Sequence, residues 1–292
     1  MAIASALMAQ VQAELGDPNA DTQSGKFTSS VIYGWLDEAQ KEWCVKLMPL
    51  IGINSQTVVT NQDSVALPTD NIMIDAVSSR RGWLRKVQAI GITDWLNQQS
   101  AVRTALSTDP AMFTEIDQRA YVFPRYSGSS LVSLINASTS TTATTLTMAS
   151  TGNLTSYGRA KIEASEVIEY TGKTDTTLTG VRRGLENTTA TSYASAASVA
   201  QCDYIAYYRR YPIALASTAT PEIKAAYHEK LKAYAKYMGY MMEGSFDKAQ
   251  AQLGVWQTAL ADAEYAEKKK FLMTDRIRDM DSQIVSNIYG PV

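Results

Sequence analysis

The chain has 292 residues, 45% of them hydrophobic and 19% charged, with a formal net charge of −2. This composition is globular, and it argues against a protein that grips nucleic-acid phosphates over a broad surface, because such proteins are usually basic. The two cysteines, Cys44 and Cys202, are too few for a disulfide framework or a zinc site. Neither a signal-peptide pattern nor an apolar run of roughly 20 residues is present, so we predict no signal peptide and no membrane span.

The first fifty residues predict two amphipathic helices. Residues 2–15 carry apolar side chains at helical spacing, and Gly16 is suited to end that helix. A second helix is expected to begin at Thr28, with Phe27 and Ile32 forming a hydrophobic staple. Its apolar face consists of Ile32, Trp35, Ala39, Trp43 and Leu47. We interpret the two tryptophans as a large contact with the C-terminal helices.

From Gln56 onward the apolar period becomes two, which is typical of strands. The pattern predicts three hairpins, which pair residues 57–59 with 64–67, 72–77 with 83–90, and 112–116 with 119–123. A short helix is expected after Thr93. We interpret this region as a small, mainly antiparallel β element set among helices.

Composition changes sharply in the next segment. No charged residue lies between Arg125 and Arg159, and residues 138–155 are mostly Ser and Thr. Thr favours strands, and strand-like runs recur from residue 145 to residue 201. We therefore predict a small β domain at residues 135–201, inserted into a helical parent.

The stretch from 222 to 270 predicts a helical hairpin. Thr220 is expected to cap the first helix, and Gly244 to join it to the second. Two apolar stripes support the hairpin: Ile223, Tyr227, Leu231, Tyr234, Met238 and Met241 in the first helix, and Ala249, Leu253, Trp256, Leu260 and Ala263 in the second. A hairpin of this size cannot offset its own conformational entropy, so it must pack on other parts of the chain, on neighbouring copies, or on both.

The chain end keeps an apolar pattern at helical spacing, with Met273, Ile277, Met280, Ile284 and Ile288. Gly290 and Pro291 weaken that pattern. Because an apolar chain end often becomes ordered only on a partner, we predict a C-terminal arm that binds another protein.

Motifs for catalysis are missing from the sequence. The single histidine, His228, is expected to be an exposed helix residue, and no Gly-x-Ser-x-Gly elbow or phosphate-binding loop occurs. The acidic clusters at 37–38 and 163–169 are interpreted as solvated or ion-paired surface. The basic pairs, such as Arg182 with Arg183, are interpreted as solvated or subunit-facing charges. We therefore predict no enzyme activity, cofactor or metal. A wall-degrading enzyme would depend on the paired carboxylates alone.

Several runs together resemble a tailed-bacteriophage head-to-tail adaptor (connector) protein. They are Phe27-Thr28 through Trp35-Leu36-Asp37-Glu38-Ala39-Gln40, Ala66-Leu67-Pro68, Tyr207-Tyr208-Arg209-Arg210-Tyr211-Pro212, Tyr227-His228-Glu229 and Glu243-Gly244-Ser245-Phe246-Asp247-Lys248-Ala249. The runs 166–172 and 177–184 resemble a small β module seen in phage virion proteins. Related modules often have Gly before the Thr-Thr pair, where this chain has Asn187.

This resemblance implies a structural virion protein without catalysis. Its copies would form a homo-oligomeric ring, commonly a dodecamer, that connects the portal protein to the tail tube or nozzle proteins and to fibres. Genomic DNA would pass through the lumen during DNA ejection without sequence-specific binding, and no membrane would be involved. Localisation would be the phage neck and tail, after assembly in the host cytoplasm.

The resemblance also suggests roles for two residue sets. Such adaptors often send a C-terminal segment into the portal, which here gives a portal-binding arm of Phe271, Met273, Ile277, Met280, Ile284, Ile288 and Tyr289. Subunit packing is assigned, as a hypothesis, to Trp35, Trp43, Tyr227, Tyr234, Met238 and Trp256.

The predicted fold class is α+β: a helical bundle core with a C-terminal helical hairpin and small antiparallel β elements, plus an inserted all-β domain. The predicted domains are a discontinuous adaptor core at 1–134 and 202–270, the inserted β domain at 135–201, and an extended C-terminal arm at 271–292. The alternative function is a tail-fibre-docking or host-contact protein that acts through the inserted β domain.

Overall fold

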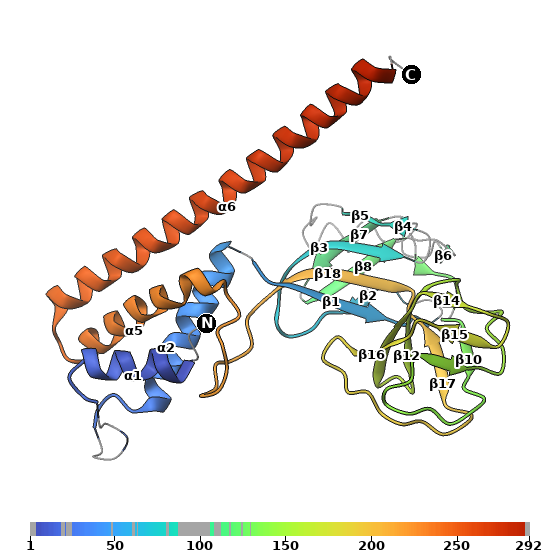
Figure 1. Ribbon diagram of the computed structural model, residues 1–292, viewed down its shortest axis with the longest axis horizontal. Helices are drawn as coiled ribbons and strands as arrows, with labels where there is room; N and C mark the ends of the chain where they lie inside the picture. Colours follow the sequence, from blue (N-terminus) through green and yellow to red (C-terminus); the bar gives the residue numbers. More distant parts are fainter. Residues whose placement is uncertain are drawn as a thin grey trace. The chain divides into compact units, whose positions relative to one another are not determined.

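We analysed a computed structural model of the chain (Figure 1), which describes residues 4–18, 21, 25–47, 49–59, 62, 64–79, 82–86, 106–107, 112–116, 118–123, 125–128 and 130–289. The chain divides into two compact units. Unit 1 is Met1–Leu50 with Arg210–Val292, and unit 2 is Ile51–Arg209. The chain mixes helices with several small antiparallel sheets, as predicted. The domain boundaries drawn from the sequence differ from these units and stay a prediction.

Unit 1 is helical in its described part. Its helices are α1 (Ala4–Glu14), α2 (Ser29–Leu47), α5 (His228–Met242) and α6 (Phe246–Tyr289), with a 3-10 turn, η1 (Ala225–Tyr227), before α5. Gly16 and Gly244 both have positive φ, which suits the left-handed residue after a helix. Phe27 and Ile32 are both buried, as the predicted staple requires.

Helix α5 begins at His228, so the predicted start near Glu222 with a Thr220 cap is wrong. The reason is a polar network that holds the preceding loop. Arg210 donates two hydrogen bonds to the Glu222 carboxylate, at 2.6 and 3.0 Å, and the same carboxylate accepts the Ile213 N–H at 2.6 Å. From α2, the buried Gln40 accepts the Glu222 N–H at 2.8 Å. These bonds hold the segment in a non-helical path.

Helices α1 and α5 run side by side in the same direction. Lys232 donates to Gln10 at 2.7 Å, Lys236 pairs with Glu14 at 2.7 Å, and Gly239 faces Leu15 at the end of α1. Helix α6 returns antiparallel to α5 and continues through Lys270 to Tyr289 (Figure 1). Residues 271–289 are therefore helical backbone rather than extended chain.

Unit 2 contains two small sheets that share a hydrophobic core. One has the order β1-β18-β3-β4 and the other β2-β8-β7-β5, with a separate β6-β9 pair. The strands are β1 (Ile51–Gln56), β2 (Ser64–Ala66), β3 (Asn71–Ser79), β4 (Gly82–Trp83), β5 (Arg85–Lys86), β6 (Leu106–Ser107), β7 (Met112–Ile116), β8 (Arg119–Phe123), β9 (Arg125–Tyr126) and β18 (Tyr204–Arg210). The β5–β7 and β6–β9 pairs are parallel, and the β1–β18, β3–β4, β2–β8 and β7–β8 pairs are antiparallel.

The hairpin predicted at 112–116 with 119–123 is confirmed as β7 and β8. The one predicted at 57–59 with 64–67 is wrong: β2 pairs with β8, and residues 57–59 form no strand. Instead, Val58 exchanges hydrogen bonds with Ser130, through the Ser130 N–H at 2.8 Å and its hydroxyl at 2.7 Å. Strand β4 does fold back on β3, but the helix predicted after Thr93 lies outside the described residues.

The rest of unit 2 contains two further antiparallel sheets with a hydrophobic core of their own. Their orders are β10-β17-β12-β13-β16 and β11-β15-β14. The strands are β10 (Val132–Leu134), β11 (Thr145–Thr147), β12 (Gly158–Ile162), β13 (Glu166–Tyr170), β14 (Gly172–Lys173), β15 (Thr177–Thr179), β16 (Arg182–Leu185) and β17 (Ser198–Gln201). Asn187 has φ of 61°, a left-handed conformation that Asn adopts more readily than most residues. It therefore suits the position where related modules have Gly.

Candidate functional site

The aromatic residues proposed for subunit packing lie mostly inside unit 1. Trp43 is the centre of the group: its ring centroid is 4.9 Å from that of Tyr227 and 5.3 Å from that of Trp256. Tyr234 lies 5.5 Å from Trp256, and the Trp256 N–H donates to Glu42 at 3.2 Å. The two tryptophans are each 1% exposed, so they stabilise the helical unit itself. A role in subunit packing stays a prediction for the set.

Trp35, Met238 and the two tyrosines of that set are partly buried. Trp35 packs near Phe27, with ring centroids 6.1 Å apart. These four side chains retain surface that a neighbouring molecule can reach, unlike Trp43 and Trp256. Burial raises the pKa of Tyr234, and the nearby Glu38 and Glu42 raise it further. The phenol is therefore neutral at physiological pH.

An exposed apolar cluster lies at the turn between α5 and α6. Met241, Met242 and Phe246 are 41%, 56% and 66% exposed. The prediction that Met241 belongs to the buried stripe is wrong. Helix α1 ends at Glu14, the next residue, Leu15, lies against Gly239, and the last turn of α5 extends beyond this contact. Exposed apolar clusters of this kind often mark interaction surfaces.

The predicted portal-binding residues all lie on α6. Phe271, Met273, Ile277, Met280, Ile284, Ile288 and Tyr289 belong to its helical backbone, and their side chains lie outside the described part. Among described side chains, the buried positions of α6 run from Ala249 to Ala263. The helix has 44 residues against the 15 of α5. It is therefore about 66 Å long, some three times the length of its partner.

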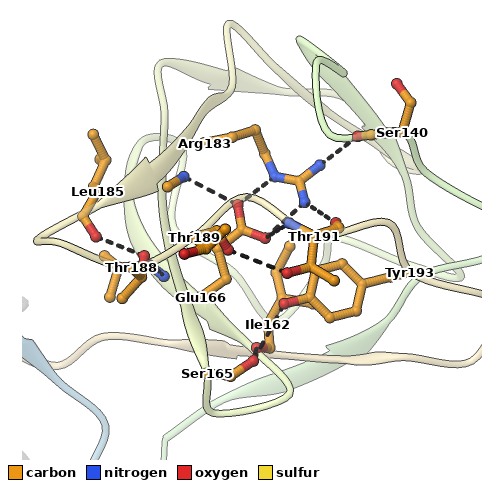
Figure 2. A network of polar contacts seen from close by, with 12 residues as sticks. Ser140, Ile162, Ser165, Glu166, Arg183, Leu185, Thr188, Thr189, Thr191 and Tyr193 are labelled. Carbon is orange, nitrogen blue, oxygen red and sulfur yellow. Dashed lines mark hydrogen bonds and ion pairs between the residues drawn. The ribbon is translucent and has the colours of Figure 1, made fainter.

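The sheets β10-β17-β12-β13-β16 and β11-β15-β14 together form what we call the β module of unit 2. The most buried ion pair among the described side chains lies in this module (Figure 2). Arg183 on β16 reaches Glu166 on β13 through Nε at 2.6 Å and Nη2 at 2.7 Å. The carboxylate also accepts the N–H groups of Gly184 at 3.1 Å and Thr191 at 3.2 Å. Arg183 makes two further bonds, to the carbonyls of Ser140 and Thr191. Both side chains are almost fully buried.

Glu166 is ion-paired, which was one of the predicted alternatives, but Glu166 and Arg183 are buried, so the prediction that they lie at the surface is wrong. Burial raises the pKa of Glu166, but the hydrogen bonds and charge of Arg183 and the N–H groups of Thr191 and Gly184 lower it more, so the net pKa lies below 4.5. Strand alternation could have indicated this, since Arg182 and Arg183 must face opposite sides of the sheet. Arg182 is indeed exposed and pairs with Glu169 at 3.1 Å.

Both cysteines and the single histidine are buried. Burial raises the pKa of both Cys44 and Cys202 to about 12, so neither thiol is ionised near neutral pH. His228 is 2% exposed, which corrects the prediction of an exposed residue. Its Nε2 lies 2.9 Å from the carbonyl oxygen of Ile223, which places the ring inside the α5 N-terminal turn.

Among the described residues, no group of three or more His, Cys, Asp and Glu residues has a geometry that could hold a metal ion. None of the described helices combines the length and the apolar character needed to span a membrane.

Comparison with known families gives the class of the protein. The profile of the SU10 adaptor protein family matches residues 3–283, which is nearly the whole chain. The chain therefore belongs to the SU10 adaptor protein family, a family of phage structural proteins. Membership implies a place in the virion and contacts with other virion components. No curated protein matches the chain.

Proposed function

We propose that this protein forms a ring that connects the portal to the tail and lines the channel through which DNA leaves the head. The observation that carries this proposal is the family match over residues 3–283. The long helix α6 and the exposed apolar turn before it supply surfaces for partner proteins. The net charge of −2 suits a channel that lets DNA slide, because each phosphate contact would add affinity and hinder passage.

The C-terminal half of α6 is the proposed portal-binding arm. Its apolar residues recur at spacings of three and four, which places them on one face of the helix. An amphipathic helix that inserts its apolar face into a groove is a common mode of protein recognition. Ring neighbours and the tail tube or nozzle proteins would contact the remaining surfaces.

Truncation after Lys270 tests the arm. The shortened protein should keep the helical core, because the described buried residues of α6 end at Ala263. Its affinity for purified portal should fall by at least about tenfold, or ~1.4 kcal/mol, in a pull-down or interferometry titration. Circular dichroism would report whether the helical core persists.

A matched pair of substitutions sharpens this test. Ile284→Asp places a charge on the apolar face, and Gln283→Asp places the same charge one residue away. The first should weaken portal binding by about 2 kcal/mol or more, because an unpaired charge would enter an apolar contact, whereas the second should have little effect. Equal portal affinity for the truncated and full-length proteins would refute the arm.

Electron microscopy of the purified protein, with and without portal, tests the ring. Ring-shaped particles, on their own or on the portal, are expected. A protein that stays monomeric when mixed with portal would contradict the proposal.

The alternative role, tail-fibre docking or host contact through the inserted β domain, has one observation in its favour. The core residues of this predicted domain, from Ile135 to Val199, form a separate hydrophobic cluster, and the strands at its two ends are paired, with Val132 of β10 opposite Ala200 of β17. Replacing 135–199 by a short Gly-Ser linker should therefore leave the rest of the chain folded. Virions that assemble tails but lack fibres or host binding would assign this role to the module.

A further inference from the structure

Unit 2 contains a hollow that its proposed adaptor role does not explain. It lies where the β3–β4 hairpin meets the start of β12 and the end of β17, and its volume is about 750 Å³. This volume is within the range of roughly 300–1,000 Å³ that is typical of small-molecule sites. Both sides of the hollow belong to the same compact unit.

Two exposed aromatic side chains line the hollow. Trp83 on β4 is 67% exposed and Tyr157, just before β12, is 74% exposed. The Trp83 ring is supported by Tyr207 of β18, with centroids 5.4 Å apart. An indole or phenol combines a flat apolar face with a polar N–H or O–H group, so such rings suit ligands that are partly apolar and partly polar.

The charged side chains of the hollow already have partners within the protein. Arg159 pairs with Glu186 at 2.5 Å and lies 3.8 Å from a Glu169 oxygen. Asp203 accepts the hydroxyl hydrogen of Ser130. A phosphate or carboxylate ligand would require a cation that is free to pair with it, and the hollow's Arg159 is committed elsewhere. The pairing of Arg159 therefore disfavours an anionic ligand, and we consider a neutral one.

Neutral polar groups are available to such a ligand. Within the described part of the chain, the hydroxyls of Ser78, Ser156 and Tyr157 and the indole N–H of Trp83 have no hydrogen-bond partner. These groups offer donors and acceptors beside two apolar ring faces. A sugar presents the matching surface, with hydroxyl groups at its rim and C–H groups on its faces.

We infer that this hollow binds a neutral oligosaccharide, with sugar rings packed against Trp83 and Tyr157. The hydroxyls of Ser78 and Ser156 hydrogen-bond the sugar hydroxyls. This inference is independent of the proposed ring, because every residue that it uses lies in unit 2.

The full-length protein is titrated with maltohexaose, cellohexaose and chitohexaose, and a sulfated heparin hexasaccharide serves as the charged comparison. Saturation-transfer NMR and tryptophan fluorescence report binding. At least one neutral probe should bind with a Kd of about 1 mM or lower. Trp83→Ala should raise that Kd about tenfold, because the ring's buried area against the sugar is lost.

Controls separate loss of the site from loss of the fold. Tyr265→Ala removes an aromatic ring of similar exposure on α6 and should leave the Kd unchanged. Ser156→Trp fills the hollow from an exposed position and should abolish binding without lowering the melting temperature. Failure of all three neutral probes to saturate at about 10 mM, tighter binding of heparin, or a normal Kd for Trp83→Ala would each overturn the inference.

Discussion

Glu166 is a single side chain on which much of the β module depends. Its carboxylate accepts hydrogen bonds from Arg183, Gly184 and Thr191, so it ties β13 to β16 and to the loop after β16. Arg183 also contacts the ring of Tyr193, with its guanidinium 5.7 Å from the centroid. Removing one member of a buried pair costs much more than the pair contributes, because the other charge is left without a partner.

We expect Glu166→Ala to destabilise the module by about 3–5 kcal/mol at neutral pH, since the Arg183 guanidinium would stay buried and unpaired. Hydrogen exchange of the β13 and β16 amides in the full-length protein measures this local free energy. Glu169→Ala is the matched control: it removes the partner of Arg182, whose side chain is 70% exposed, and should cost at most about 1 kcal/mol.

Acid should weaken the same region. Because the folded-state pKa of Glu166 is lowered, its contribution is fully present above about 4.5, the ordinary value, and is lost as the pH falls through the folded-state pKa. Protection of β13 and β16 should therefore drop below that pH in the wild type and much less in Glu166→Gln. Equal protection in Glu166→Ala and Glu169→Ala would contradict the importance of this pair.

The sequence pattern predicted the strand that contains Glu166, but it did not predict that the Glu166–Arg183 ion pair is buried. The run containing Glu166 was correctly expected to be a strand, but β16 with Arg183 was not predicted and Glu166 was expected at the surface. Burial of an ion pair depends on a partner from another strand, which periodicity does not reveal. His228 is similar: its burial comes from the preceding loop, whose path is set by Gln40 and Arg210 far away in sequence.

In the β1–β18 ladder, Gly52 lies against the ring of Tyr208. A Cβ at this position would lie 2.7 Å from both Cε1 and the hydroxyl oxygen of Tyr208, its partner across the ladder. Tyr208 is buried and its hydroxyl donates to Asp70 at 3.2 Å, so the ring has little freedom to move. Glycine is required here by space and not by its backbone angles.

Gly52→Ala should destabilise unit 2 by about 1–3 kcal/mol, because the new methyl group overpacks against a fixed ring. Gly254→Ala in α6 is the control, since a Cβ there meets nothing within 4 Å. That substitution should instead stabilise the helix by about 0.5–1 kcal/mol. Thermal unfolding should show shifts of opposite sign, and a neutral Gly52→Ala would show that Tyr208 is free to rotate away.

Strand pairings between neighbours in the sequence were predictable, and pairings between distant strands were not. The β7–β8 hairpin follows from its local alternation and turn. Strand β1 pairs with β18, about 150 residues later, and β2 pairs with β8. The local hairpin suggested by the sequence near Val58 and Val65 therefore does not form. Similarly, the apolar stripe on α6 correctly predicted that Trp256 and Leu260 are buried. Met241 of α5 was also expected to be buried, but it is exposed because the last turn of α5 extends beyond α1.

The chain as a whole contains separate hydrophobic cores in its two units. Trp43 and Trp256 lie in the helical core, whereas Leu178 belongs to the core of the β module. Compact units with separate cores commonly unfold as separate transitions, so a single free energy of unfolding does not describe the chain.

Calorimetry should therefore resolve two transitions or more. Trp43→Ala should lower the free energy of unfolding of the helical unit by about 3–5 kcal/mol. Leu178→Ala should lower that of the β module by about 2–5 kcal/mol, because each substitution creates a cavity in one core only. A single transition that both variants shift equally would show that the units unfold together.

The chain leaves the helical unit and returns to it at neighbouring points. The Arg210 N–H donates to the Leu50 carbonyl at 3.2 Å, and Ile51 lies opposite Arg209 in the next pair of the ladder. Residues 51–209 are therefore a cassette whose two ends meet, and the helices would keep their path if that cassette were exchanged for another. Exchange of residues 51–209 for another segment whose ends adjoin is therefore expected to leave the helical unit folded.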